Sequence, residues 1–264
     1  MPDLKFNEFV DIVKRLRKEC PWDREQTNES IKAATIEEAY EVVEAIEKKD
    51  YTNLKSELGD LLLHVVFHTI IASETQDFTI DDVINSIKSK LIRRHPHVFG
   101  EVKVSNSEEV KKNWEEIKLS EGRESILDGV PEILPALQRA HRLQEKAAKV
   151  GFDWEKKEDV WKKVIEEIEE MHEVELQRKK TVDEKTDEKF YEILEDEVGD
   201  VFFALVNYAR FLGINPENAL RRTNKKFIAR FHYIEKRISE TGKIISESNL
   251  MEMDKYWEES KKII

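Results

Sequence analysis

The sequence predicts an all-α protein that consists of two tandem copies of one helical-bundle unit. Charged residues make up 38% of its 264 residues, whereas only eight are Gly and six are Pro, and this composition favours long helices over a β-sandwich or a low-complexity chain. The segment Glu-Leu-Gly-Asp at residues 57–60 returns as Glu-Val-Gly-Asp at residues 197–200, and an apolar run follows it each time. Such self-similarity indicates a duplicated structural unit.

The bulk composition limits the classes of partner. The net charge of −12 argues against a long nucleic acid, which needs a basic surface, but a mononucleotide stays open because Mg²⁺ can bridge phosphate and carboxylate groups. Cys20 is the single cysteine, so no internal disulfide is expected. The N-terminus has no apolar targeting segment, and no run of 18 apolar residues occurs. We therefore expect a soluble, cytoplasmic protein that does not bind membranes.

Apolar residues at helical spacing predict five helices in the first copy. They cover residues 4–19, about 28–49, a segment that begins after the turn at 50–53 and ends near 73, 78–94 and 107–120. The first carries Phe6, Phe9 and Val13 on one face. The fourth is stopped by Pro96, because proline cannot continue a helix. Ser107 is the predicted N-cap of the fifth.

The same series of helices starts again after a segment rich in Gly and Pro. We predict a first repeat at 1–121, a linker at 122–134 and a second repeat at 135–264. The helices of the second copy are predicted at 136–150, 160–178, 190–211, 216–239 and 248–262. A charged loop at 179–187, longer than its counterpart, separates two of them.

Acidic residues from two neighbouring helices form a candidate metal site in each copy. On each helix they lie three residues apart and share a face, and the short connection predicts that the two helices are antiparallel neighbours. Carboxylate ligands select Mg²⁺ or Mn²⁺, and Mg²⁺ keeps positions that substrate phosphates can fill. A single such pair would be ordinary surface charge, but both pairs recur in order. The candidate ligands are Glu38, Glu41, Glu57 and Asp60 in the first copy and Glu167, Glu170, Glu197 and Asp200 in the second.

Two features of the repeated segment need a cause beyond packing. The residues after Asp60 are apolar on almost every side, which predicts a buried helix and draws this carboxylate toward the interior, where it is costly without a cation. Gly59 lies within the same helix, where Gly costs about 1 kcal/mol relative to Ala. We expect another helix or a ligand to approach this glycine closely.

Basic and aromatic residues also recur in both copies. In the first copy they are Lys90, Arg94, Trp114 and Lys118, and in the second copy Lys226, Arg230, Trp257 and Lys261. A cation suits a phosphate and an aromatic ring suits a stacked base, although each residue alone would be surface charge or core. Lys163 lies one turn before Glu167 and could reach a phosphate, but its counterpart is Ala34.

Histidines carry less information. His64 and His68 follow Asp60 at metal-ligand spacing, but the second copy has Ala and Tyr at these positions, so we favour core or supporting roles for them. A Glu169-x-x-His172 pattern is typical of di-iron bundles. It lies on another face of its helix than Glu167, and the first copy lacks it, so we discount a di-iron site.

The order Glu-Glu-x-x-Glu at 37–41 and Glu-x-x-Asp at 57–60 resembles the MazG family of nucleoside triphosphate pyrophosphohydrolases, within the all-α NTP pyrophosphatases. Segments 20–27, 93–99 and 150–154 look like the two-copy form of that family. The resemblance implies that each copy is a helical-bundle NTP pyrophosphatase unit and that the protein is a homodimer. It also implies Mg²⁺-dependent hydrolysis of NTPs and dNTPs at the α–β phosphoanhydride to NMP and pyrophosphate, in a house-cleaning or stringent-response role.

The resemblance further implies nucleotide contacts by Lys163, Lys226, Arg230 and Trp257. Because the first copy lacks a counterpart of Lys163, we expect the second copy to be the better nucleotide site. The base that takes the proton of the attacking water is one of Glu166, Glu167 and Glu170, among which the sequence does not choose. Two alternatives are a non-catalytic helical module that senses nucleotide or docks a partner, and an inorganic pyrophosphatase, for which Trp257 would be dispensable.

Overall fold

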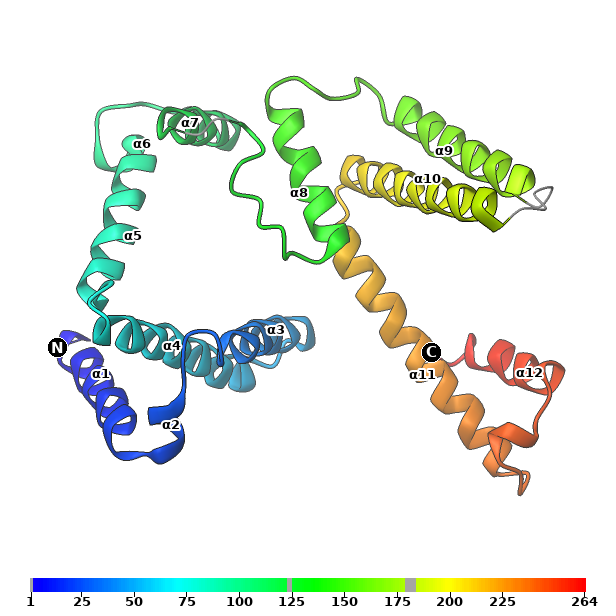
Figure 1. Ribbon diagram of the computed structural model, residues 1–264, viewed down its shortest axis with the longest axis horizontal. Coiled ribbons are helices and arrows are strands. Elements are labelled where there is room, and N and C mark those ends of the chain that lie inside the picture. Colours follow the sequence, from blue (N-terminus) through cyan, green and yellow to red (C-terminus); the bar gives the residue numbers. More distant parts are fainter. Residues whose placement is uncertain (1, 123–124, 179–183) are drawn as a thin grey trace. The chain divides into compact units, whose positions relative to one another are not determined.

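Figure 1 shows the computed structural model of the protein, which describes residues 2–122, 125–178 and 184–264. Throughout these ranges every regular element is a helix, so the predicted all-α class is confirmed. The chain forms two compact units, Met1–Trp114 and Glu115–Ile264. The division into two repeats around a linker at 122–134 stays a prediction.

The first unit contains a hairpin of two helices, α3 and α4, and further helices before and after it. Its elements are α1 (Pro2–Glu19), α2 (Pro21–Glu25), α3 (Lys32–Lys48), α4 (Tyr51–Glu74), α5 (Ile80–Arg94), α6 (Pro96–Phe99) and the start of α7 (Ser107–Ser120). The core lies between α1 and the second half of α4, where Val10, Val13, Val66 and Phe67 are buried. α3 packs along α4, as the short connection through Asp50 predicts.

Local sequence signals account for most helix ends in this unit. The side chain of Asp50 accepts from the backbone N–H groups of Thr52 and Asn53 at the start of α4, and Thr79 and Asp82 form a capping box on α5. The predicted cap of α7 is wrong by one residue. Asn106 Oδ1, not the Ser107 hydroxyl, accepts from the backbone N–H of Glu109 at 3.0 Å.

The second unit repeats the helix pair and adds a second hairpin. Its elements are α8 (Ala136–Lys149), α9 (Lys157–Arg178), α10 (Glu184–Phe211), α11 (Pro216–Ser239), a short 3-10 helix (Ile245–Glu247) and α12 (Leu250–Ser260). α9 and α10 lie side by side, and α12 packs on α11 around Ile234, Ile238 and Tyr256 (Figure 1). Residues 184–187 are helical rather than part of the predicted loop, of which 179–183 lie outside the described residues. The predicted helix at 248–262 is shorter than expected.

The long helices are not buried all round, which corrects the prediction for the segment after Asp60. One side of α4 is buried, but Leu58 is 50% exposed and Leu62 is 42% exposed. In α10, Phe202 is 57% exposed. A Cβ atom on Gly59 or Gly199 would meet nothing within 4 Å among the described residues, so the close contact with another helix that was expected at these glycines is not found there.

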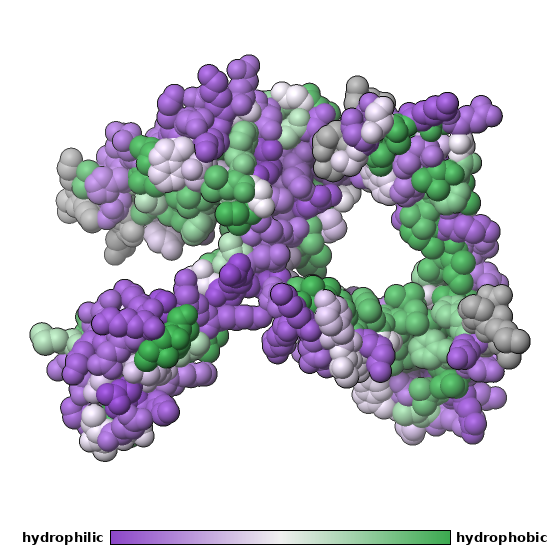
Figure 2. All heavy atoms as spheres, turned by 180° about the vertical axis from the view of Figure 1, so that it is seen from behind, coloured by the Kyte–Doolittle hydropathy of each residue, from purple (hydrophilic) through white to green (hydrophobic). Residues whose placement is uncertain are grey.

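Apolar groups thus reach the surface in patches between charged ones (Figure 2). The apolar character of α4 and α10 exceeds what their own units cover. Within the ranges that the structure describes, no helix has both the length and the apolar character needed to cross a bilayer.

Candidate functional site

α9 and α10 bring three predicted ligands of the second copy together. Glu167 on α9 and Glu197 and Asp200 on α10 each offer a carboxylate oxygen, and these oxygens lie within 4.8 Å of one another. The meeting follows from the local sequence, because each helix presents its acids on the face that it turns to its antiparallel neighbour. Glu167 is only 8% exposed. An ionised carboxylate that is buried to this extent is costly unless a cation lies close to it.

Glu170 lies one turn after this group. Loss of hydration raises the pKa of its carboxyl above the ordinary value, and the charge of Lys163 opposes the rise. A hydrogen bond with Glu167 adds to the rise. Glu170 is therefore close to the three grouped ligands, although its oxygens do not belong to the group itself.

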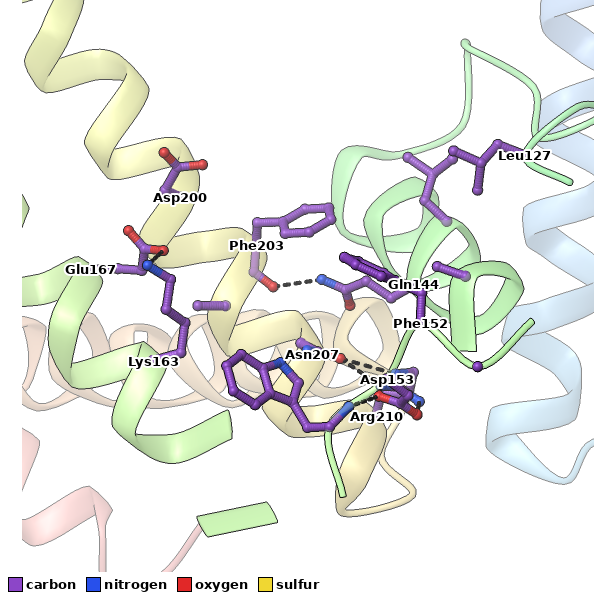
Figure 3. A pocket seen from close by; sticks show the side chains of 15 residues that line it. Leu127, Gln144, Phe152, Asp153, Lys163, Glu167, Asp200, Phe203, Asn207 and Arg210 are labelled. Atoms are coloured by element: carbon purple, nitrogen blue, oxygen red, sulfur yellow. Dashed lines mark hydrogen bonds and ion pairs between the residues drawn. The ribbon is translucent and has the colours of Figure 1, made fainter. Parts of the chain in front are cut away.

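Lys163 is the counter-ion of the acids on α9. Its Nζ atom lies 2.6 Å from Glu166 Oε1 and 2.8 Å from Glu167 Oε1. These two hydrogen bonds raise the pKa of the Lys163 ammonium well above its ordinary value. Figure 3 shows the ammonium pointing to the Glu167 carboxylate.

The first unit holds a matching acidic group between α3 and α4. Oxygens of Glu38, Glu41 and Glu57 lie within 4.8 Å of one another. Loss of hydration raises the pKa of Glu38, and the charges of Glu41 and Asp60 raise it further. The pKa of Glu57 is raised by loss of hydration and then by a hydrogen bond with Glu41. The predicted ligand Asp60 is thus near the group without being part of it.

The two histidines of α4 support this group from the side. Thr35 Oγ1 lies 2.9 Å from His64 Nδ1 and 2.8 Å from His68 Nε2. His64 Nε2 lies 4.0 Å from Glu38 Oε1, so this histidine stands beside the acidic group, whose grouped oxygens come from Glu38, Glu41 and Glu57. Burial lowers the pKa of His68, and His64 lowers it further. These contacts fit the supporting role expected for both histidines.

The predicted basic and aromatic residues pair with each other in both units. The guanidinium carbon of Arg94 lies 5.7 Å from the centre of the Trp114 ring, and that of Arg230 lies 5.5 Å from the Trp257 ring. This agreement supports the equivalence of the two copies. Lys261 pairs with Glu258 on α12.

A pocket of about 770 Å³ opens beside the acids of the second unit. Lys163, Glu167 and Asp200 lie along it, as Figure 3 shows. Its apolar walls come from Leu127, Leu143, Phe152, Trp154, Phe203 and Ala204. None of the predicted nucleotide contacts on α11 and α12 lines this pocket, so their part in the site stays a prediction.

Sequence reasoning did not find this pocket. One signal was present on α10, where Asp200, Phe203, Asn207 and Arg210 follow at helical spacing and so share one face. The other walls come from Leu127 before α8, from α8 itself, from the loop after it and from the start of α9. Pairing between such distant segments leaves no periodic pattern in a single sequence.

Charged and amide groups hold the walls of the pocket in place. Arg210 binds the Asp153 carboxylate through both terminal nitrogens, at 2.9 Å and 2.5 Å, and Gln144 donates to the Phe203 carbonyl oxygen at 2.8 Å. The ammonium of Lys146, a residue only 3% exposed, donates to the carbonyl oxygens of Ile126 and Asp128, which flank the wall residue Leu127. The site therefore combines an apolar pocket, whose walls are held by hydrogen bonds, with an edge of oxygen ligands, a set that fits Mg²⁺ or Mn²⁺.

Comparison with known proteins agrees with the duplicated architecture. The MazG nucleotide pyrophosphohydrolase domain is found twice, at residues 26–99 and 155–234. Each match contains the four acids and the basic pair of its copy, whereas Trp114 and Trp257 lie outside.

Several curated proteins match nearly the whole of this chain. The chain is 43% identical over 261 residues to the nucleoside triphosphate pyrophosphohydrolase/pyrophosphatase MazG of Thermotoga maritima, covering 97% of this chain and 95% of that protein. It is 41% identical over 266 residues to a nucleoside triphosphate pyrophosphohydrolase of Escherichia coli (strain K12), covering 98% and 97%. It is also 46% identical to the uncharacterized protein YabN of Bacillus subtilis, over 97% of this chain and 52% of that protein. The chain belongs to the MazG nucleotide pyrophosphohydrolase family and carries two copies of its domain.

Proposed function

We propose that the protein hydrolyses NTPs and dNTPs at the α–β phosphoanhydride and releases NMP and pyrophosphate, with Mg²⁺ as its cofactor and Mn²⁺ as a possible substitute. One observation carries this proposal: carboxylates of two helices converge at the edge of an apolar pocket large enough for a nucleoside. The names of the Thermotoga maritima and Escherichia coli relatives support the same activity.

The acids of the second unit are the proposed metal ligands. Glu167, Glu197 and Asp200 would hold the ion, and Glu170 is near enough to join them. A bound Mg²⁺ supplies charge neutralisation for the phosphates and a lower pKa for an attacking water. Glu38, Glu41, Glu57 and Asp60 are the corresponding ligands proposed for the first unit.

The other residues of the site position the nucleotide and move the proton. Phe152, Trp154 and Phe203 suit the base and the sugar, because flat apolar rings favour stacking. Lys163 suits a phosphate. One of Glu166, Glu167 and Glu170 would take the proton of the water. Glu170 lies beside the three grouped ligands without belonging to their group, so its carboxylate could face a water there.

The cationic and aromatic residues on α11 and α12 are proposed as further contacts. Lys226, Arg230 and Lys261 would balance phosphate charge, and Trp257 would pack on base or sugar. In the first unit Lys90, Arg94, Lys118 and Trp114 are the proposed equivalents. The paired Arg and Trp side chains in both units support this correspondence.

We also propose a homodimer. The support is the apolar surface of the helix pairs, where Leu58, Leu62 and Val65 of α4 and Phe202 and Leu205 of α10 are 40% exposed or more. A partner subunit that covered these side chains would account for the apolar character of both helices.

Product analysis tests the activity. The purified protein, Mg²⁺ and a panel of NTPs and dNTPs should yield NMP and pyrophosphate. Glu197→Gln and Asp200→Asn should abolish hydrolysis by the second unit, whereas Glu169→Gln, on another face of α9, should not. NDP and phosphate would contradict the cleavage position, and hydrolysis of pyrophosphate alone would indicate an inorganic pyrophosphatase.

Two further outcomes would contradict the proposal in different ways. Mg²⁺-dependent nucleotide binding without turnover would favour the non-catalytic sensor. Full activity in the double variant Glu57→Gln/Glu197→Gln would show that these carboxylates are not needed for hydrolysis.

A further inference from the structure

The two units differ at one position beside their acids. Lys163 lies four residues before Glu167, and Ala34 lies four residues before Glu38. Both positions lie on the first helix of the pair, α9 or α3, one turn before the acid. At this position, therefore, the second copy of the site carries an ammonium group and the first copy does not.

In the second unit the Lys163 ammonium forms an ion pair with a carboxylate that is also a proposed metal ligand. Lys163 Nζ lies 2.8 Å from Glu167 Oε1, and Glu167 is a member of the group with Glu197 and Asp200. Because Glu167 is almost fully buried, its charge depends on a close counter-ion. A lysine ammonium and a divalent cation compete for this role.

The same lysine is within reach of a ligand in the pocket. Its side chain is 35% exposed and lines the pocket next to Asp200. An ammonium has three donors, and a triphosphate offers more negative charge than one carboxylate. A triphosphate that enters here would draw Lys163 away from Glu167 and free that carboxylate for the cation.

We propose that Lys163 makes divalent cation binding in the second unit depend on nucleotide binding, whereas the first unit, with Ala34, binds the cation without nucleotide. Without a triphosphate, Lys163 holds Glu167 and the cation binds weakly. With a triphosphate, Lys163 turns to the phosphates and the cation binds tightly. This proposal rests on the proposed function to the extent that the triphosphate binds beside Glu167.

Among the described residues, the groups recorded around the acids of the first unit include no lysine or arginine. The groups that act on Glu38 are the carboxylates of Glu41, Asp60 and Glu37 and the imidazole of His64, and Glu57 belongs to the same group of oxygens. Mutual repulsion of these carboxylates favours a cation with or without nucleotide.

Mn²⁺ binding to the full-length protein tests the coupling. Electron paramagnetic resonance reports free and bound Mn²⁺ and needs no turnover. Glu57→Gln removes a ligand of the first unit and so leaves the cation site of the second unit to be measured, and Glu197→Gln does the reverse. Each is titrated with Mn²⁺ in the presence and absence of an α,β-imido triphosphate, which is not cleaved at the proposed bond.

We expect the triphosphate to raise the Mn²⁺ affinity of the second unit about 10-fold or more, the size of one charge-assisted hydrogen bond, and to change the first unit far less. Lys163→Ala should give the second unit tight Mn²⁺ binding without nucleotide. Ala34→Lys should give the first unit the nucleotide dependence. Lys162→Ala is the matched control, because Lys162 pairs with Asp159 rather than with the grouped acids.

Equal Mn²⁺ affinity of the second unit with and without the triphosphate would overturn the proposal, as would an unchanged affinity in Lys163→Ala. Failure of the proposed function looks different. If the products of an NTP were NDP and phosphate, the cleavage position would be wrong while the Mn²⁺ coupling could still be measured and would stand or fall by itself.

Discussion

The ion pair between Asp153 and Arg210 allows a sharp test of how the pocket is held together. Asp153 belongs to the loop between α8 and α9 and Arg210 to the end of α10, so the pair fastens the wall residues Phe152 and Trp154 to α10. We consider Asp153→Asn, which keeps the size of the side chain and removes its charge.

The magnitude follows from burial and geometry. The Arg210 side chain is 15% exposed and that of Asp153 is 27% exposed, and the pair is bidentate. The amide of Asn can accept only one of the two hydrogen bonds, so one charge-assisted bond is lost. The largely buried guanidinium then has neutral partners: the new amide, the Asn207 side chain and the Phe211 ring. We expect a loss of about 2 kcal/mol in the free energy of unfolding of the second unit. For a unit of this size, that corresponds to a fall of about 4–8 °C in its Tm.

Calorimetry and hydrogen exchange measure this effect. The loss of Tm should be accompanied by faster amide exchange in residues 150–156 and, with an NTP substrate, by a rise in KM larger than the change in kcat. Asp159→Asn is the control, since it breaks an exposed pair with Lys162 and should leave Tm unchanged. If Asp153→Asn behaved like this control, the pair would not fasten the wall and the reasoning would be refuted.

Three further predictions concern charge, a buried lysine and an aromatic pair. The pKa of Glu57 is raised in the folded state, so its carboxylate destabilises the fold increasingly as the pH rises above the ordinary value of 4.5. With a chelator present, Glu57→Gln should therefore raise Tm at pH 7 but not at pH 3.5. Equal shifts of Tm at both pH values would contradict this. Lys146→Met should lower the free energy of unfolding by about 2 kcal/mol and speed amide exchange at residues 125–129, because the ammonium no longer binds the carbonyl oxygens there. Unchanged exchange would show that Lys146 does not hold this segment. Arg230→Gln should lower the unfolding free energy by about 0.5–1 kcal/mol, read by the fluorescence of Trp257, and Trp257→Leu should abolish that difference.

Local patterns predicted the helices and the acidic groups because both depend on short spacing. The convergence of Glu38 with Glu57, and of Glu167 with Glu197, follows from helical periodicity and a short connection. The role of Lys163 as a counter-ion could not be predicted, because its spacing to Glu166 and Glu167 allows it to face either the acids or the pocket.

Other features depend on contacts that a single sequence does not encode. An apolar run shows that a helix is covered by something, but not whether its own chain covers it, and so α4 was expected to be buried. Likewise, adjacent polar residues such as Asn106 and Ser107 differ in capping only by how the chain turns before α7. The pocket joins three segments distant in sequence, and no spacing rule relates them.

The glycines at the surface of α4 and α10 mean that the two helix pairs are less stable than their backbones allow. A Cβ atom added at Gly59 or at Gly199 has nothing within 4 Å in the part of the chain that the structure describes, so each Gly→Ala replacement should add about 1 kcal/mol of helix stability. Evolution toward a more heat-resistant form thus has two open positions beside the acids. If such a replacement raised Tm and lowered activity, the glycine would be retained because function needs the space of a Cβ atom, at the expense of stability.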